Sequence, residues 1–347
     1  MGHGMLRAIL AALLLEVTAP ISSAAEPVRY EFESKHMGTS FRIVMHHADK
    51  AKAVTAAEAA FARVAVLERV LSDYRADSEV MTLCKRNDAD PGKPMPISSD
   101  LAKMMRVALD QSRLTDGAFD VTVGPLTKLW RISRKTQEPT PKPELTIALG
   151  LVGFDKIRLD ENAKTLALAD AGMRLDFGGI GKGFAVDEAL IVLKEKHGIE
   201  NVLMAAAGDV TCRGTPPGKP GWLVEIAPLR KGEPTRSLLL KDRSVSTSGD
   251  LEQVAVIGGV RYSHVLNPKT GIGLTGRRSV TVIGRGGAIT DALTKAACVL
   301  PPERVAALFR KLLDRDYLSV LQEDDAKPLS IIHTPGFTKY LSATVEE

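Results

Sequence analysis

The segment of residues 174–184 constrains the fold most, because it places four glycines and a lysine where a strand ends and a helix begins. It reads Arg-Leu-Asp-Phe-Gly-Gly-Ile-Gly-Lys-Gly-Phe. Successive backbone N–H groups at such a turn, with the positive end of the helix and the side chain of Lys182, form a cradle for a phosphate group. The alternative is that the glycines only let the helix pack closely on the strand.

Neither of two standard phosphate-binding motifs matches this segment. The pattern G-x-x-x-x-G-K-[ST] requires Gly at position 176 and Ser or Thr at position 183, where the chain has Asp176 and Gly183. The pattern G-x-G-x-x-G requires a glycine at position 184, which is Phe184. A phosphate site in this segment is therefore of neither kind.

A second segment, residues 288–297, carries side chains that suit a metal ion. Asp291 and Thr294 are three residues apart on an expected helix, so a carboxylate and a hydroxyl share one face and converge on a hard cation. The alternative is that Thr290 or Asp291 caps the helix N-terminus by accepting its first free backbone N–H groups. On this segment alone, capping is favoured.

A third segment, residues 262–271, ends in Asn-Pro-Lys-Thr-Gly, which predicts a turn that projects the residues before it. His264 lies there and is a candidate general base. A single histidine beside a turn more often makes only a structural hydrogen bond, so this segment alone decides nothing.

The apolar pattern predicts an α+β fold with meandering mixed sheets and inserted helices, because most strands follow one another without a helix between them. The polar, proline-bearing stretch 133–146 is expected to be a surface connection. The expected strands cover 30–34, 39–46, 156–160, 165–169, a stretch into Leu175, 201–206, 222–227, 236–241, 253–257, 279–283, 317–321 and 329–333. The expected helices cover 51–71, 99–117, 185–197, 289–300 and 302–313.

Charge and composition exclude one class of partner. The 347 residues carry 46 basic and 42 acidic side chains, a net charge of +4, which is too small a positive field to drive binding to a phosphate backbone. We therefore expect no nucleic-acid partner. The hydrophobic fraction of 44% is that of an ordinary globular protein with a sizeable core.

Residues 1–25 are expected to be a secretory signal peptide, followed by one domain over 26–347. Arg7 precedes the apolar run 8–15, and small residues at 22–25 offer a cleavage site. That run is far shorter than the roughly 20 residues that span a bilayer, so no transmembrane segment is expected in the mature chain. No cysteine precedes Cys84, which excludes a lipid anchor on an N-terminal cysteine. We expect a soluble periplasmic protein.

The three cysteines, Cys84, Cys212 and Cys298, allow at most one disulfide and are expected to be buried thiols. No cluster of cysteine and histidine has the spacing of a zinc site.

Taken together and in this order, the segments resemble the ApbE family, the FAD:protein FMN transferases once called thiamine biosynthesis lipoproteins. Eight ordered motifs carry the resemblance over nearly the whole mature chain, and so many in order are hard to obtain by chance. They are 37–39, 73–75, 116–125, 176–184, 208–209, 246–250, 264–271 and 290–300. The resemblance implies an FAD cleft between two interwoven subdomains.

The resemblance also implies an activity. An enzyme of this kind takes FAD, splits its pyrophosphate with the help of Mg²⁺, attaches the FMN half through a phosphoester to a threonine or serine of a partner protein, and releases AMP. The acceptor would be an extracytoplasmic protein with a Ser/Thr flavinylation motif. Mn²⁺ is an alternative metal, because both ions accept octahedral oxygen ligands.

Site residues follow from the same resemblance. Asp176 and Lys182 would fix FAD, with Lys182 near its phosphates, and Lys182 and Asp291 would be the catalytic pair. The backbone carbonyl of Gly179 and the side chain of Asp291 would hold Mg²⁺. The residues expected to contact the flavin, stack on a ring or line the pocket are Met37, Tyr74, Ala118, Phe119, Asp120 and Leu266.

One residue departs from the family pattern. Four positions after the metal-binding aspartate the family commonly has a threonine ligand, whereas this chain has Lys295, with Thr294 one position earlier. A protonated ammonium cannot bind Mg²⁺ and repels it. Thr294 can supply the ligand instead, Lys295 can point away, or the site can bind metal weakly while the ammonium takes part of its electrostatic role. The first of these is favoured.

Three other functions stay open from the sequence. An FAD pyrophosphatase that delivers FMN and AMP to water would use the same residues. A non-catalytic FAD-binding protein would follow if Lys295 marks a lost metal site. The segments could also be purely structural, in which case the chain would have no affinity for FAD.

Overall fold

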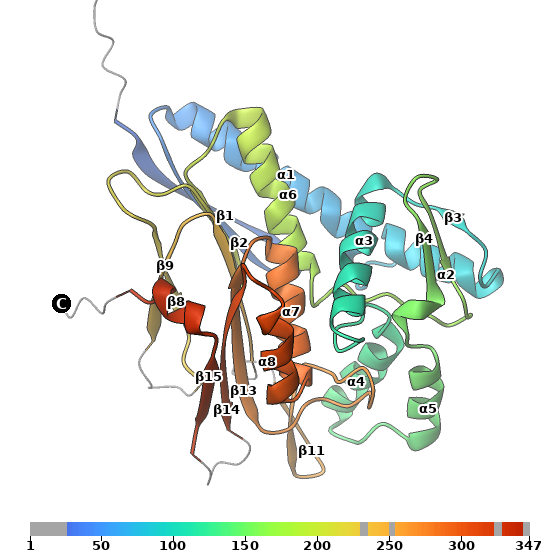
Figure 1. Cartoon of the computed structure of the whole chain (residues 1–347). Helices are drawn as coiled ribbons and strands as arrows, with labels where there is room; N and C mark the ends of the chain where they lie inside the picture. Colours follow the sequence, from blue (N-terminus) through green and yellow to red (C-terminus); the bar gives the residue numbers. More distant parts are fainter. Residues whose placement is uncertain (1–25, 230–234, 250–253, 323–327, 343–347) are drawn as a thin grey trace, which may run out of the picture.

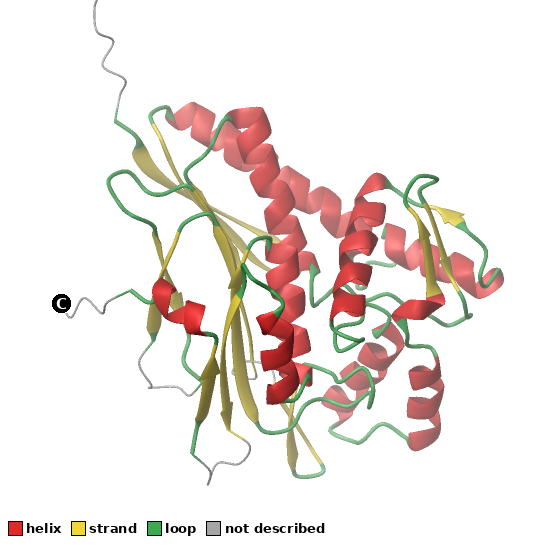
Figure 2. Cartoon of the chain, viewed as in Figure 1, coloured by secondary structure: helices red, strands yellow, loops and turns green. Residues whose placement is uncertain are grey.

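The computed structural model describes residues 26–229, 235–249, 254–322 and 328–342 (Figure 1). The expected signal peptide, residues 1–25, lies outside them. No helix among the described residues is long and apolar enough to cross a membrane. A large sheet lies on one side of the molecule, and most helices, together with a small sheet, lie on the other (Figure 2).

An eight-stranded sheet forms the centre of the molecule, and its paired strands are antiparallel. The sheet order is β1-β2-β6-β7-β10-β13-β14-β15. Its strands are β1 (Val28–His36), β2 (Thr39–His47), β6 (Val202–Ala206), β7 (Asp209–Arg213), β10 (Arg243–Gly249), β13 (Arg277–Gly284), β14 (Asp316–Gln322) and β15 (Ser330–His333). Alternate side chains of a strand face opposite sides of the sheet, so Val282 joins one core and Ile283 the other.

Four helices cover one face of this sheet: α1 (Lys50–Leu71), α6 (Gly181–His197), α7 (Gly287–Val299) and α8 (Pro302–Arg310) (Figure 1). In α1 the buried residues recur every three or four positions, which is the stripe of an amphipathic helix. Helix α6 packs between α1 and α7, and α7 lies directly on β10 and β13. This packing brings the start of α7 next to the start of α6.

A second layer lies beyond these helices (Figure 1). It consists of α2 (Glu79–Ala89), α3 (Ser99–Leu114), α4 (Gly124–Thr136), α5 (Lys142–Gly150), the short η1 (Phe154–Lys156), and a small sheet of β3 (Met95–Pro96), β5 (Thr165–Leu168) and β4 (Ile157–Asp160). The buried side chains of α1, α3, α6 and α7 belong to one continuous hydrophobic core.

The opposite face of the large sheet is covered by the pair β8 (Trp222–Ile226) and β9 (Arg236–Leu240) and by η2 (Pro335–Tyr340). Trp222, Leu238 and Phe337 form a second core there with sheet residues such as Ile283. A hairpin of β11 (Val254–Ile257) and β12 (Val260–Ser263) packs on α4 through Trp130.

The structure confirms the α+β class and most expected elements, but one expectation is wrong in its bounds and another is wrong. The surface connection expected over 133–146 covers only 137–141, because α4 runs through Thr136 and α5 begins at Lys142, each with a proline in its first turn. The expected strand into Leu175 is only an isolated parallel bridge between Val123 and Arg174. The cysteines are buried free thiols, as expected.

Candidate functional site

The glycine-rich segment has the predicted form of a turn that opens a helix. Helix α6 begins at Gly181, and its first N–H groups receive no side-chain cap. Asp176 braces the turn, because its Oδ1 accepts the N–H of Gly178 at 2.7 Å while its own N–H donates to the carbonyl of Val121 at 2.8 Å. The positive end of α6 and the backbone of the turn therefore lie beside Lys182, as a phosphate cradle requires.

A charged cluster lies next to this turn. It consists of Lys182 from α6, Asp209 from β7, and Asp291 and Lys295 from α7. The Nζ of Lys182 lies 3.3 Å from Asp209 Oδ2 and 3.6 Å from Asp291 Oδ2, and the Nζ of Lys295 donates to Asp291 Oδ1. Segments more than 20 residues apart in sequence thus place two ammonium groups and two carboxylates together.

Mutual attraction favours the charged forms of Lys182 and Asp291. Burial would raise the pKa of Asp291, but the ammonium groups of Lys182 and Lys295 hold it below its usual value. Burial would lower the pKa of Lys182, but Asp291 and Asp209 raise it well above its usual value. Burial and the neighbouring Asp291 raise the pKa of Asp209. Lys182 and Asp291 therefore form a charged pair across neutral pH.

The expected capping role of Thr290 or Asp291 is wrong, because another residue caps α7. Asp187 of α6 accepts the N–H of Gly287 at 2.8 Å and the N–H of Ala288 at 3.0 Å. The hydroxyl of Thr290 instead donates to the Gly287 carbonyl at 3.1 Å. The carboxylate of Asp291 is left for the charged cluster, and its Oδ2 receives no hydrogen bond from the described residues.

Thr294 and Lys295 lie on different sides of α7. The Thr294 Oγ1 is buried 2.6 Å from Ser248 Oγ and donates to the Asp291 backbone carbonyl at 2.7 Å. The Lys295 stem lies against Gly179, where its Cγ would be 3.3 Å from a Cβ added at that glycine. The alternative in which Lys295 points away is therefore wrong. The ligand roles of Gly179, Asp291 and Thr294 stay predictions.

An arginine that sequence reasoning missed joins two of the expected FAD residues. The guanidinium of Arg131 in α4 lies 4.1 Å from the centre of the Tyr74 ring, and its Nη2 lies 2.7 Å from Asp73 and 3.9 Å from Asp176. The Tyr74 side chain is exposed, and the guanidinium of Arg131 lies over its ring. The stacking of FAD on Tyr74 stays a prediction. Had a helix been predicted over 124–136, Arg131 could have been recognised from the sequence as a candidate site residue.

Ala118, Phe119 and Asp120 are buried beside the glycine-rich turn. The ring of Phe119 would lie 3.4 Å from a Cβ added at Gly179. Both carboxylate oxygens of Asp120 serve the protein itself, since Oδ1 accepts the N–H and hydroxyl of Thr122 and Oδ2 accepts the N–H of Phe154. Asp120 thus ties its own loop to the start of η1, and its role in lining an FAD pocket stays a prediction.

Met37 and Leu266 lie on separate turns. Met37 has a left-handed backbone (φ 49°) in the β1–β2 turn and donates its N–H to Glu68 Oε1 at 2.9 Å. Leu266 packs in the small core around Trp130. The turn predicted after it is confirmed, because the N–H of Gly271 donates to the Asn267 carbonyl at 2.8 Å. The flavin contact of Met37, the lining role of Leu266 and the base role of His264 stay predictions.

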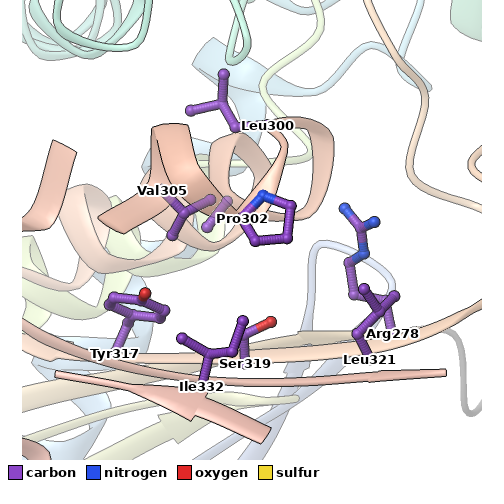
Figure 3. A pocket seen from close by; sticks show the side chains of 9 residues that line it. Arg278, Leu300, Pro302, Val305, Tyr317, Ser319, Leu321 and Ile332 are labelled. Atoms are coloured by element: carbon purple, nitrogen blue, oxygen red, sulfur yellow. The ribbon is translucent and has the colours of Figure 1, made fainter. Parts of the chain in front are cut away.

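One pocket lies away from this site, between α8 and strands β13 to β15 (Figure 3). Its lining is largely apolar and includes Leu300, Pro302, Val305, Tyr317 and the stem of Arg278. Among the described residues, no expected site residue lines it. This pocket is therefore separate from the candidate phosphate site.

The fold and the cluster define a class of site, in which a glycine turn at a helix start lies beside a lysine between two buried carboxylates. The chain belongs to the ApbE family, whose family model matches residues 37–318. This match confirms the resemblance carried by the sequence motifs.

Individual relatives agree with the family. A protein of Haemophilus influenzae named FAD:protein FMN transferase is 28% identical over 314 residues, which cover 86% of this chain and 89% of the relative. A protein of Treponema pallidum with the same name is 30% identical over 305 residues, covering 83% of each chain.

Solved structures share the fold. The crystal structure of the ApbE protein from Thermotoga maritima superposes with a TM-score of 0.79 at 28% identity and covers 91% of this chain and 100% of that one. The apo form of the Pseudomonas stutzeri flavinyl transferase ApbE has the same TM-score and identity, and covers 92% and 99%. Similarity over nearly the full length of both chains confirms the expected fold.

Proposed function

We propose that this chain is an exported flavin transferase that cleaves FAD, attaches the FMN half through a phosphoester to a threonine or serine of an extracytoplasmic partner protein, and releases AMP. Membership of the ApbE family and the transferase names of its relatives support the reaction class. The observation that carries the proposal is Lys182, whose ammonium lies between Asp209 and Asp291 at the start of the glycine-opened helix α6.

In this proposal, each part of FAD is assigned to residues around Lys182. Its pyrophosphate would lie at the start of α6, where Lys182 and the helix end stabilise negative charge. A ring of FAD would stack on Tyr74, with Asp176 fixing the ligand. Met37, Ala118, Phe119, Asp120 and Leu266 would line the rest of the pocket and contact the flavin.

The chemistry is a displacement at phosphorus. The acceptor hydroxyl oxygen forms a bond to the phosphorus of the FMN half, and the bond from that phosphorus to the bridging oxygen breaks. The bridging oxygen leaves on AMP, and the hydroxyl proton passes to the AMP phosphate or to solvent. Charge grows on the phosphate oxygens during this step, so the lysine ammonium stabilises the transition state more than the bound substrate.

The expected divalent cation does not fit the side chains as they lie. Lys295 takes one oxygen of Asp291, and Lys182 lies 3.6 Å from the other. Near a protein surface, two unit charges 4 Å apart interact by about 4 kcal/mol, so two ammonium groups oppose a cation here. We therefore assign no step to Mg²⁺ or Mn²⁺.

Export to the periplasm is part of the proposal and depends on the expected signal peptide at residues 1–25. Proteolysis during export can be followed by the N-terminal sequence of the secreted protein. An N-terminus near Glu26 supports export, and a cytoplasmic full-length chain contradicts it.

The product pattern tests the proposed reaction. Residues 26–347 are incubated with FAD, Mg²⁺ and a small acceptor domain that carries the Ser/Thr motif, and nucleotides are separated by chromatography. A transferase yields AMP without an equal amount of free FMN. Equal AMP and free FMN indicate a pyrophosphatase, and intact FAD indicates a binding protein. Lys182→Gln is expected to lower the rate by about 100-fold, whereas Lys194→Gln, an exposed lysine on the same helix, is expected to leave it unchanged.

A further inference from the structure

Lys295 lies in the gap between the two residues that a divalent cation would have to join. Its ammonium donates to Asp291 Oδ1. Its stem passes Gly179, where Cγ and Cδ would be 3.3 and 3.8 Å from an added Cβ. A cation bound to Asp291 Oδ1 beside Gly179 would compete with this ammonium for the same oxygen.

With Lys295 included, the charges of the cluster sum to zero when both carboxyl groups are ionised. Lys182 and Lys295 carry two positive charges, and Asp209 and Asp291 carry two negative charges when ionised. Buried charges are stable only when paired, and Asp291, which is fully buried, has an ammonium near each of its oxygens. The carboxylates therefore need no further cation for balance.

The two lysine side chains are more exposed than the two carboxylates of the cluster. The side chains of Lys182 and Lys295 are 23% and 18% exposed, whereas those of Asp209 and Asp291 are 4% and 0% exposed. Because the lysine side chains are more exposed than the carboxylates, an anionic ligand at the start of α6 is favoured over a cation. The ammonium of Lys295 can then donate to a phosphate oxygen.

We propose that Lys295 is a catalytic residue whose ammonium takes the place of a divalent cation, so that this chain binds FAD and transfers FMN without Mg²⁺ or Mn²⁺. The inference rests on the proposed function. Lys295 and Lys182 hold the two phosphates of FAD while the acceptor oxygen bonds to the FMN-side phosphorus and the bridging oxygen leaves with AMP. The hydroxyl proton goes to the AMP phosphate or to solvent, and the flavin keeps its oxidation state.

Binding measurements test this without relying on turnover. FAD affinity is measured by flavin fluorescence in EDTA and in Mg²⁺, and Mg²⁺ is titrated calorimetrically into the protein with and without FAD. We expect the wild-type FAD affinity to change by less than about twofold between EDTA and Mg²⁺, with no saturable Mg²⁺ binding.

Three variants sharpen the test. Lys295→Met keeps the methylene stem against Gly179 and is expected to lose about tenfold in FAD affinity, with no rescue by Mg²⁺. Lys295→Thr is expected to lose a similar amount in EDTA and to regain it in Mg²⁺, because a hydroxyl can ligate the cation. Lys194→Met, an exposed lysine on α6, serves as the control and is expected to match the wild type.

Wild-type FAD affinity that rises about tenfold with Mg²⁺, or saturable Mg²⁺ binding to the wild type, overturns the inference. Unchanged FAD affinity in Lys295→Met also overturns it. If a variant fails to fold, as judged by thermal melting, the wild-type titrations alone decide. If AMP never forms under any condition, the proposed function fails, while the titrations still decide whether Lys295 replaces a cation.

Discussion

Gly183 of α6 lies so close to Gly287 of α7 that a methyl group at position 183 would be 2.1 Å from the Gly287 carbonyl oxygen. The backbones of the two helices are in direct contact here, so a side-chain rotation in either helix could not make room for the methyl group. This close approach lets Asp187 cap α7 and brings Lys182 within 3.6 Å of Asp291. The last glycine of the turn therefore positions the charged cluster, apart from any role in binding phosphate.

Gly183→Ala is expected to destabilise the fold by at least about 2 kcal/mol, because α6 and α7 must separate to admit the methyl group. Urea denaturation measures the loss. Gly150→Ala is the matched control, since an added Cβ there meets nothing within 4 Å and Gly150 ends a helix. Equal stability of Gly183→Ala and Gly150→Ala would contradict the close packing.

Asp187 predicts a pH dependence of stability. Burial raises its pKa from 3.8 to about 6, although the two N–H groups that it accepts work in the opposite direction. Between these values the folded chain binds a proton that the unfolded chain has lost, so this contribution to stability is full below about pH 4 and is lost as the pH rises through 6.

Asp187→Asn removes this titration. The difference between the wild-type and variant curves therefore reports Asp187 alone and not the other buried carboxyl groups. The free energy of unfolding is measured for both proteins from pH 4 to 7, and the wild-type curve is expected to fall relative to that of the variant by on the order of 3 kcal/mol. Parallel curves would show that Asp187 is already ionised in the folded protein at pH 4.

Arg131→Ala is expected to weaken FAD binding about fivefold, roughly 1 kcal/mol, because the Tyr74 ring loses the cation that supports it. Flavin fluorescence titration measures the affinity. Lys135→Ala, an exposed cation in the last turn of the same helix, is the control. If Arg131→Ala and Lys135→Ala bind FAD equally well, Tyr74 does not depend on Arg131 for its role.

The sequence predicts local turns and strands better than it predicts contacts between residues that are far apart in the chain. The glycine turn before α6 and the strands β1 and β2 follow from local glycine content and alternating side chains, and all are confirmed. The capping of α7 was not predictable, because Asp187 reaches it from a helix 100 residues away. Lys295 illustrates both the success and the limit of prediction. Its departure from the family pattern can be seen in the sequence, whereas its ion pair with Asp291 is seen only in the structure.

The missed helices have a local cause. Pro139, Pro141 and Pro143 suggest a loop over 133–146, but Pro143 lies in the first turn of α5, where a proline costs no helical hydrogen bond. Missing α4 also hid Arg131, which is one turn before the end of that helix. Residue type alone does not distinguish a proline that starts a helix from one that prevents it.

The most direct test of the proposed function is the intact mass of a small acceptor domain with the Ser/Thr motif after incubation with residues 26–347, FAD and Mg²⁺. Asp291→Ala, which leaves Lys182 and Lys295 without their shared carboxylate, is the control. We predict that the wild type adds the mass of one FMN less one water to the acceptor and that Asp291→Ala adds none. An unchanged acceptor mass with the wild type, while FAD stays intact, would contradict the account.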